Sequence, residues 1–169
     1  LSLHDALPIL VEGNPDRLRP HIKTHKTTEG NDLFLEAGIT KFKCATIAEA
    51  ELLALSEAPD VLISMQLIGP NLERFKQLVA HYPKTKFSSI VDDAFAASEL
   101  NRIFTDLSTG VFVDLNMGMN RTGIIPSKAL ALIQHIQTLP NVTLRGLHAY
   151  DGHIRDKVYE DRAKHVETD

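Results

Sequence analysis

Basic side chains alternate along one short segment near the start of the chain, Arg19 to His25, which reads RPHIKTH. On a β-strand successive side chains point to opposite faces, so Arg19, His21, Lys23 and His25 would share one face. Neighbouring cations lower the pKa of a lysine. Only the neutral amine of a lysine can form a Schiff base with an aldehyde. The spacing therefore indicates Lys23 as a candidate Schiff-base lysine, with a solvated basic sheet edge as the alternative.

A second polar segment follows the apolar run VFVDL and reads DLNMGMNRTG, from Asp114 to Gly123. The ends of barrel strands build active sites, so this position favours a ligand-binding role. Arg121 carries a fixed charge and a planar fork of donors, which suits an oxyanion on a ligand. The alternative is a polar surface loop in which Arg121 makes an ordinary ion pair.

A third segment, Gly146 to His153, reads GLHAYDGH and ends another apolar run. Tyr150 could be an aromatic platform for a flat ligand, or it could simply pack in the core. The mixture of His148, Asp151 and His153 could in principle bind a metal. However, His148 and Asp151 fall on opposite faces of a continuing strand, so we predict no metal site within these residues.

Short apolar runs alternate with helical runs over most of the chain, and six strands are predicted: 19–25, 41–45, 61–65, 86–91, 110–116 and 142–150. Helices are predicted over 29–37, 46–55, 72–81, 92–104 and 127–137. Thr46 and Glu49 have the spacing of a capping box, and Asp92 is a candidate N-cap. Leu130, Ile133 and either Ile136 or Gln137 are expected on one face of the last helix. About six βα units favour an α/β fold with a parallel sheet, either doubly wound or part of a (β/α)8 barrel. No G-x-G-x-x-G follows the first strand, which argues against a dinucleotide-binding fold.

The composition excludes several classes of protein. The chain has 169 residues, 43% of them apolar, and a net charge of -4, which is wrong for a general nucleic-acid binder. No apolar run reaches the roughly 18 residues of a membrane span. Cys44, the single cysteine, cannot form an internal disulfide and is expected to be a buried small hydrophobe. We expect a cytoplasmic protein that binds neither nucleic acid nor membrane.

The first nine residues, LSLHDALPI, read like one translated frame of a sequencing adapter, so we set Leu1 to Ile9 aside as a sequence artefact. Residues 10–169 are then expected to form one domain. Because about six βα units cannot close an eight-stranded barrel, that domain is expected to be a partial barrel.

Five strings, taken in order, resemble the D-threonine aldolase and D-serine dehydratase family of pyridoxal-phosphate (PLP) enzymes. They are RPHIKTHK, CATIAEAELL, LIGPNLERF, VDLNMGMNRTG and GLHAYDGH, and they span most of the chain from about residue 18 to about residue 161. The resemblance implies a partial TIM-type barrel of the alanine racemase N-terminal kind (PLP fold type III). It also implies that the family's C-terminal β domain is absent from this chain.

Carried over residue by residue, the resemblance makes Lys23 the catalytic lysine that holds PLP. Arg121 matches the arginine near the phenolate oxygen, Tyr150 the side chain beside the pyridine ring, and His148 a neighbouring pocket residue. The implied reaction is cleavage of a 3-hydroxy-D-amino acid to glycine and an aldehyde. A D-serine dehydratase-like lyase, an amino-acid racemase and a non-catalytic PLP carrier are the alternatives. The resemblance further implies a divalent metal and a homodimer in the full-length protein, while nothing here matches the metal ligands, so the fragment alone is expected to be inactive.

Overall fold

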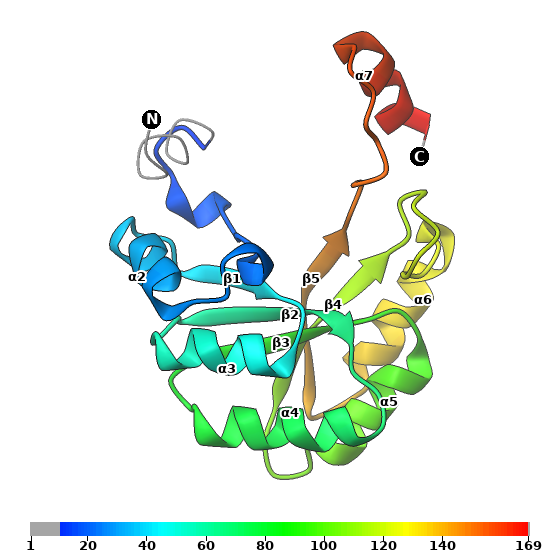
Figure 1. The fold of residues 1–169 in the computed structure, drawn as a ribbon. Coiled ribbons are helices and arrows are strands. Elements are labelled where there is room, and N and C mark those ends of the chain that lie inside the picture. Colours follow the sequence, from blue (N-terminus) through cyan, green and yellow to red (C-terminus); the bar gives the residue numbers. More distant parts are fainter. Residues whose placement is uncertain (1–10, 169) are drawn as a thin grey trace.

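A computed structural model describes residues 11–168, so the suspected adapter stretch Leu1 to Ile9 lies outside the described residues. Five parallel strands form one sheet: β1 (Lys41–Cys44), β2 (Asp60–Gln66), β3 (Lys86–Val91), β4 (Thr109–Leu115) and β5 (Val142–Ala149). The helices are α2 (Thr28–Glu36), α3 (Ile47–Leu55), α4 (Pro70–His81), α5 (Ala94–Ile103), α6 (Pro126–Gln137) and α7 (Tyr159–Thr168). Two short 3-10 turns, η1 (Pro15–Arg17) and η2 (Ile22–Thr24), precede them (Figure 1).

The order of the strands decides between the two predicted architectures. The sheet runs β1-β2-β3-β4-β5 in chain order, and every neighbouring pair is parallel. A doubly wound sheet would reverse its order at a switch point, whereas a barrel adds each strand beside the previous one. Each helix from α2 to α5 also contacts the next helix along the chain. The fold is therefore an arc of a (β/α) barrel, as predicted.

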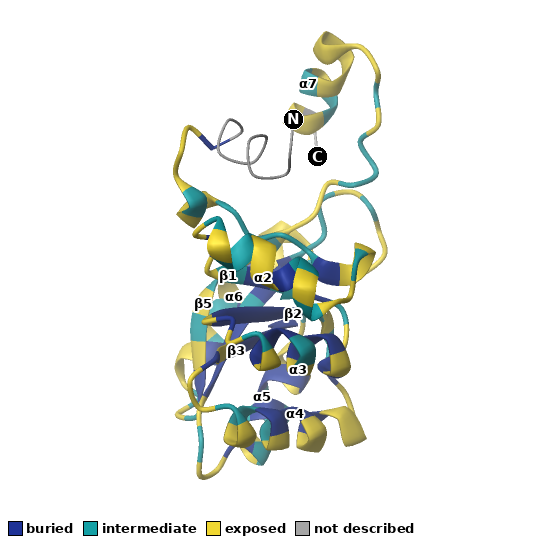
Figure 2. Cartoon of the chain, turned by 60° about the vertical axis from the view of Figure 1, so that its left-hand side comes forward, coloured by how far each residue is buried: buried dark blue, intermediate teal, exposed yellow. Residues whose placement is uncertain are grey.

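The core lies between the sheet and the helices that cover it. Figure 2 shows the buried residues on the sheet and on the inward faces of α3, α4 and α5, with exposed residues on the outward faces. Phe42, Phe75 and Phe104 are the largest fully buried side chains, and the rings of Phe75 and Phe104 lie 5.5 Å apart. Cys44 is fully buried as predicted, and burial raises the pKa of its thiol.

Helix starts follow the sequence signals closely. The predicted capping box is present: Thr46 Oγ1 accepts from Glu49 N–H, and the Glu49 carboxylate accepts from Ala45 N–H at 2.7 Å. The predicted N-cap Asp92 is wrong by one residue, because Asp93 caps α5 by accepting from the N–H of Ala96. Asp92 instead accepts hydrogen bonds from Gln66 and Gly123 at the barrel mouth.

Two predictions about local structure are wrong. The first strand, predicted over 19–25, reduces to one parallel bridge between His21 and Lys43, because the chain turns into η2 directly after His21. In α6 the error concerns Leu130 alone, which is 64% exposed; Ile136 is buried as predicted, together with Ala129 and Leu132, and Ile133 packs against the core.

A charged layer crosses the barrel interior near the amino ends of the strands. The carboxylate of Asp60 accepts from Arg19 at 2.6 Å and from Arg145 on β5 at 2.5 Å. Arg145 also donates to Ser88 Oγ, and both guanidinium groups lie over the Phe112 ring. Burial opposes ionisation of Asp60, but the hydrogen bonds from the two arginines outweigh it and lower the pKa of Asp60. The layer ties the segment before β1 to the last strand of the arc.

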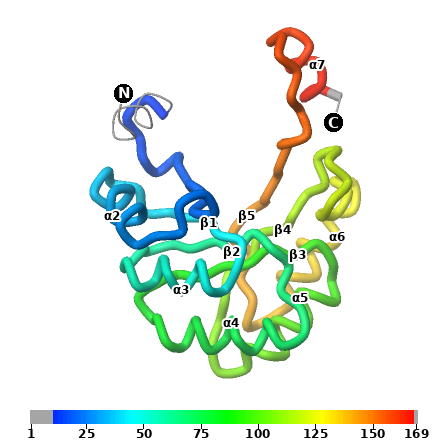
Figure 3. Tube along the Cα trace, viewed as in Figure 1, coloured from blue at the N-terminus to red at the C-terminus, as the bar shows by residue number. Residues whose placement is uncertain are grey.

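After β5 the chain leaves the sheet and runs outward to α7 (Figure 3), as the turned view in Figure 2 also shows. No helix within residues 11–168 is long and apolar enough to cross a membrane.

Candidate active site at the barrel mouth

The candidate functional residues lie at the carboxyl ends of the parallel strands. Lys43 is near the end of β1, Gln66 ends β2, Asp92 follows β3, Asp114 is near the end of β4 and His148 is near the end of β5. Because the strands are parallel, these ends meet at one edge of the sheet. The topology therefore gathers side chains that are up to 105 positions apart in the sequence.

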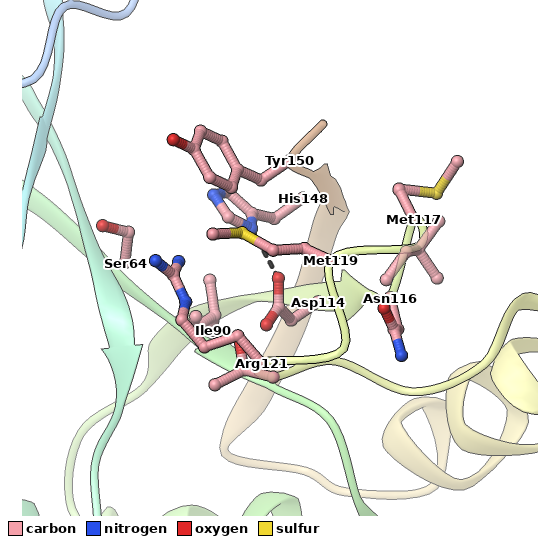
Figure 4. Close-up of a pocket in the computed structure, with 11 residues that line it drawn as sticks. Ser64, Ile90, Asp114, Asn116, Met117, Met119, Arg121, His148 and Tyr150 are labelled. Atoms are coloured by element: carbon pink, nitrogen blue, oxygen red, sulfur yellow. Dashed lines mark hydrogen bonds and ion pairs between the residues drawn. The ribbon is translucent and has the colours of Figure 1, made fainter. Parts of the chain in front are cut away.

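A hydrogen-bonded chain of three ionisable side chains crosses this edge. Asp114 Oδ1 lies 2.6 Å from His148 Nδ1, and His148 Nε2 lies 2.7 Å from Lys43 Nζ. Figure 4 shows the first of these contacts, with the Tyr150 ring next to His148. Burial opposes ionisation of Asp114, but hydrogen bonds from His148 and Thr122 outweigh it and lower the pKa of Asp114. The carboxylate is therefore charged and fixes the proton of His148 on Nδ1.

Gln66 joins the two carboxylates of the mouth. Its Nε2 donates to Asp92 at 2.9 Å and to Asp114 at 3.1 Å. Asp92 also accepts from the backbone N–H of Gly123. Gly123 has φ +100°, and a Cβ there would lie 2.6 Å from the backbone of Leu115, so a side chain cannot be accommodated.

The loop from Asn116 to Gly123 positions Arg121. Asn116 Oδ1 accepts from the N–H groups of Gly118 and Asn120, and its N–H donates to Ile124 O. Ile124 N–H in turn donates to Asp114 O, which closes the loop at its base. Arg121 therefore leaves a loop that is held at its first and last residues.

Cationic side chains gather on the Tyr150 ring. The Arg121 guanidinium lies 5.4 Å from the ring centroid and Lys43 Nζ lies 5.7 Å from it. A pocket opens beside them; its lining also includes Ser64, Ile90, Asp114, Met117, Met119 and His148 (Figure 4). The structure thus brings together three of the four predicted site residues: Arg121, Tyr150 and His148.

Lys23 lies in the η2 turn at the same mouth, and its side chain is exposed. Its N–H donates to His21 Nδ1 at 3.1 Å, so the imidazole supports the turn that carries the lysine. Burial, together with the charges of Lys23 and Lys43, lowers the pKa of His21 to about 4. Lys23 is near enough to influence Lys43 and His21, but the described residues that line the pocket do not include it.

The turn is anchored on both sides. His25 Nε2 lies 3.0 Å from Asn31 Oδ1 in α2, which makes His25 a supporting residue. Lys26 pairs with Glu49 at 3.0 Å and has φ +52°. Burial opposes ionisation of Glu49, but the hydrogen bonds from Ala45 and Lys26 lower the pKa of Glu49.

A family model described as "Alanine racemase, N-terminal domain" matches residues 10–167. The chain belongs to the alanine racemase N-terminal domain family. It is 31% identical over 152 residues to a D-threonine aldolase of an Arthrobacter species, covering 87% of this chain and 39% of that protein. It is 29% identical to a 3-hydroxy-D-aspartate aldolase of Paracoccus denitrificans, covering 86% of this chain and 39% of that protein.

The solved structure of D-threonine aldolase from Filomicrobium marinum superposes with a TM-score of 0.86 at 25% identity, covering 98% of this chain and 46% of that one. This alanine racemase-type chain therefore spans about two fifths of the curated relatives that it matches.

Several residues of this alanine racemase-type mouth were not predicted from the sequence as site residues. They are Lys43, Ser64, Gln66, Asp92 and Asp114. Their polarity could have indicated them, because Lys43, Ser64 and Asp114 are polar residues within otherwise largely apolar strands. Among residues 11–168, no group of three or more His, Cys, Asp or Glu side chains is arranged to hold a metal ion.

Proposed function

We propose that this chain is the PLP-binding part of an enzyme that cleaves 3-hydroxy-D-amino acids to glycine and an aldehyde, with Lys23 forming the Schiff base. The observation that carries the proposal is the placement of Lys23, Arg121 and Tyr150 at one mouth of an alanine racemase-type barrel. The printed names of the aldolase relatives support the substrate class.

The side chains at the mouth suit PLP, which is a flat, anionic aldehyde. Lys23 offers an amine, and the fixed charge of Arg121 suits the phenolate oxygen. Tyr150 offers a ring face, and its cationic neighbours Arg121 and Lys43 suit an anionic ligand. When bound, PLP supplies an electron sink for the bond that breaks at the substrate α-carbon.

The chain's own residues hold and orient the side chains that would contact the cofactor. Asp114 fixes the His148 imidazole, and the loop from Asn116 to Gly123 fixes the direction from which Arg121 approaches. His21 supports the backbone of Lys23. The divalent metal and the homodimer expected of the complete protein belong to the same proposal and rest on the family resemblance, whereas the cytoplasmic location rests on the single cysteine, Cys44.

The lysine assignment is tested in the protein expressed from its complete gene. The yellow absorbance of a PLP Schiff base is expected in the wild type, lost in Lys23→Ala and kept in Lys84→Ala, whose lysine is 90% exposed. Borohydride reduction followed by peptide mass spectrometry should find the cofactor on the peptide that contains Lys23. A cofactor found on Lys43, or an unchanged spectrum in Lys23→Ala, would reject the assignment.

The reaction is tested with D-threonine and D-serine. Glycine and acetaldehyde from D-threonine support the aldolase, whereas pyruvate from D-serine indicates the dehydratase. Interconversion of amino-acid enantiomers indicates a racemase. PLP binding with no turnover of any of these substrates indicates a carrier.

A further inference from the structure

A second lysine, Lys43, reaches into the barrel mouth from β1. Its strand neighbours Phe42 and Cys44 are fully buried in the core between sheet and helices, so Lys43 points to the opposite, interior side of the barrel. There its Nζ meets His148 Nε2 at 2.7 Å and faces the Tyr150 ring. A lysine inside a barrel at this position is costly unless it has a partner or a role.

The contact between Lys43 and His148 can form with Lys43 in either protonation state. Asp114 holds a proton on His148 Nδ1, so His148 Nε2 accepts and Lys43 Nζ donates. An ammonium and a neutral amine both carry N–H groups, so either form of Lys43 can donate to Nε2. Loss or gain of a proton at Nζ therefore keeps this contact, and Lys43 can serve as an acid or as a base.

The charges around Lys43 favour release of its proton. Burial, followed by the charge of Lys23, lowers the pKa of Lys43; Arg121 and Arg19 act in the same direction and Asp114 against it. The titratable and charged groups that face the pair come from every neighbouring segment: Arg19, His21 and Lys23 before β1, Asp92 after β3, Asp114 on β4, Arg121 after β4 and Tyr150 after β5.

We propose that Lys43 is an acid–base residue of this site, coupled through His148 to Asp114, for a substrate that carries a hydroxyl group beside the α-carbon. The identity of that substrate rests on the proposed function. Neutral Lys43 takes the proton of the 3-hydroxyl group, and the O–H electron pair becomes the second bond of the aldehyde carbonyl. The electron pair of the broken Cα–Cβ bond stays on the α-carbon of the glycine fragment. Lys43 then returns the proton to that α-carbon, which restores the amine.

The protonation of the Lys43 amine is tested by an experiment that does not depend on turnover. The complete protein is acylated with trace acetic anhydride over a range of pH, and peptide mass spectrometry gives the pH of half-maximal labelling for Lys43. We expect that pH to lie below that of a lysine in a reference peptide, because only the neutral amine reacts and the pKa of Lys43 is lowered. Asp114→Asn should lower it further, because the carboxylate favours the charged form, and Lys41→Met should leave it unchanged. A midpoint equal to that of the reference peptide overturns the proposal.

The role is tested with Lys43→Met and Lys43→Arg, with Lys41→Met as the matched control on the same strand. Arginine keeps the charge but cannot release its proton. Both Lys43 variants should therefore lose at least tenfold in kcat with KM changed less than threefold, while the PLP absorbance persists. Recovery of kcat in Lys43→Arg, or full activity in Lys43→Met, overturns the proposal. If the wild type cleaves no 3-hydroxy-D-amino acid, the proposed function fails. The pH of half-maximal labelling then still shows whether Lys43 has the lowered pKa that an acid–base residue needs.

Discussion

Replacing Asp60 with asparagine tests how strongly the charged layer holds the barrel arc. Asp60 has a side chain 12% exposed, and its partners Arg19 and Arg145 are 21% and 27% exposed. Asparagine keeps one acceptor, so one charge-assisted hydrogen bond is lost, at about 1.5–3 kcal/mol. Two partly buried guanidinium groups also lose their counter-charge. Together these effects should lower the free energy of unfolding by about 2–4 kcal/mol, near the lower end of values for breaking a buried pair.

The measurement is urea unfolding of the complete protein, wild type against Asp60→Asn, at several pH values. Because the pKa of Asp60 is lowered by folding, its contribution is fully present above the unfolded value of about 3.9 and disappears as the pH falls through the folded value. The difference between the two proteins should therefore be constant near neutral pH and shrink in acid.

The control is Glu57→Gln, since Glu57 pairs with Lys84 at 3.9 Å and both side chains are more than 80% exposed. That variant should change stability by less than about 0.5 kcal/mol. A loss below 1 kcal/mol in Asp60→Asn at neutral pH, or a difference that grows in acid, would refute the reasoning.

Two further changes test how the Lys23 turn is supported. Glu49→Ala removes both the acceptor of Ala45 N–H and the partner of Lys26, so it should destabilise the protein by about 1–3 kcal/mol and weaken PLP binding, as measured by thermal unfolding and cofactor titration. Gly30→Ala places a Cβ 2.4 Å from His25 Cδ2, so it should cost about 1–3 kcal/mol despite the better helix propensity of alanine; a stabilised variant would show that the His25 ring moves freely.

Most of the arc could be predicted from the sequence because apolar residues are spaced differently along strands and along helices. β3 was predicted at its observed bounds, and the capping box was predicted from Thr46 and Glu49 alone. These features depend on residues close in the chain. The segment 19–25 was harder, because alternation favoured a strand. The His21 side chain instead accepts from Lys23 N–H and stabilises a turn.

The candidate site was only partly predictable, for a related reason. Arg121, Tyr150, His148 and its partner Asp114 stand in recognisable strings, but Lys43, the other partner of His148, does not. Lys43 is 105 positions from His148, and only the sheet order makes them neighbours. The shift from Asp92 to Asp93 as the cap of α5 likewise follows from Asp92 binding Gly123, which is 31 positions away.

The loop from Asn116 to Gly123 has a consequence for the thermodynamics of ligand capture. Its hydrogen bonds are made among its own residues, the end of β4 and Asp92, so little backbone conformational entropy remains to be lost when an anion meets Arg121. Association at this cation should therefore proceed with a small entropic penalty. Opening the loop, for example with Asn116→Ala, would make that penalty visible in calorimetry.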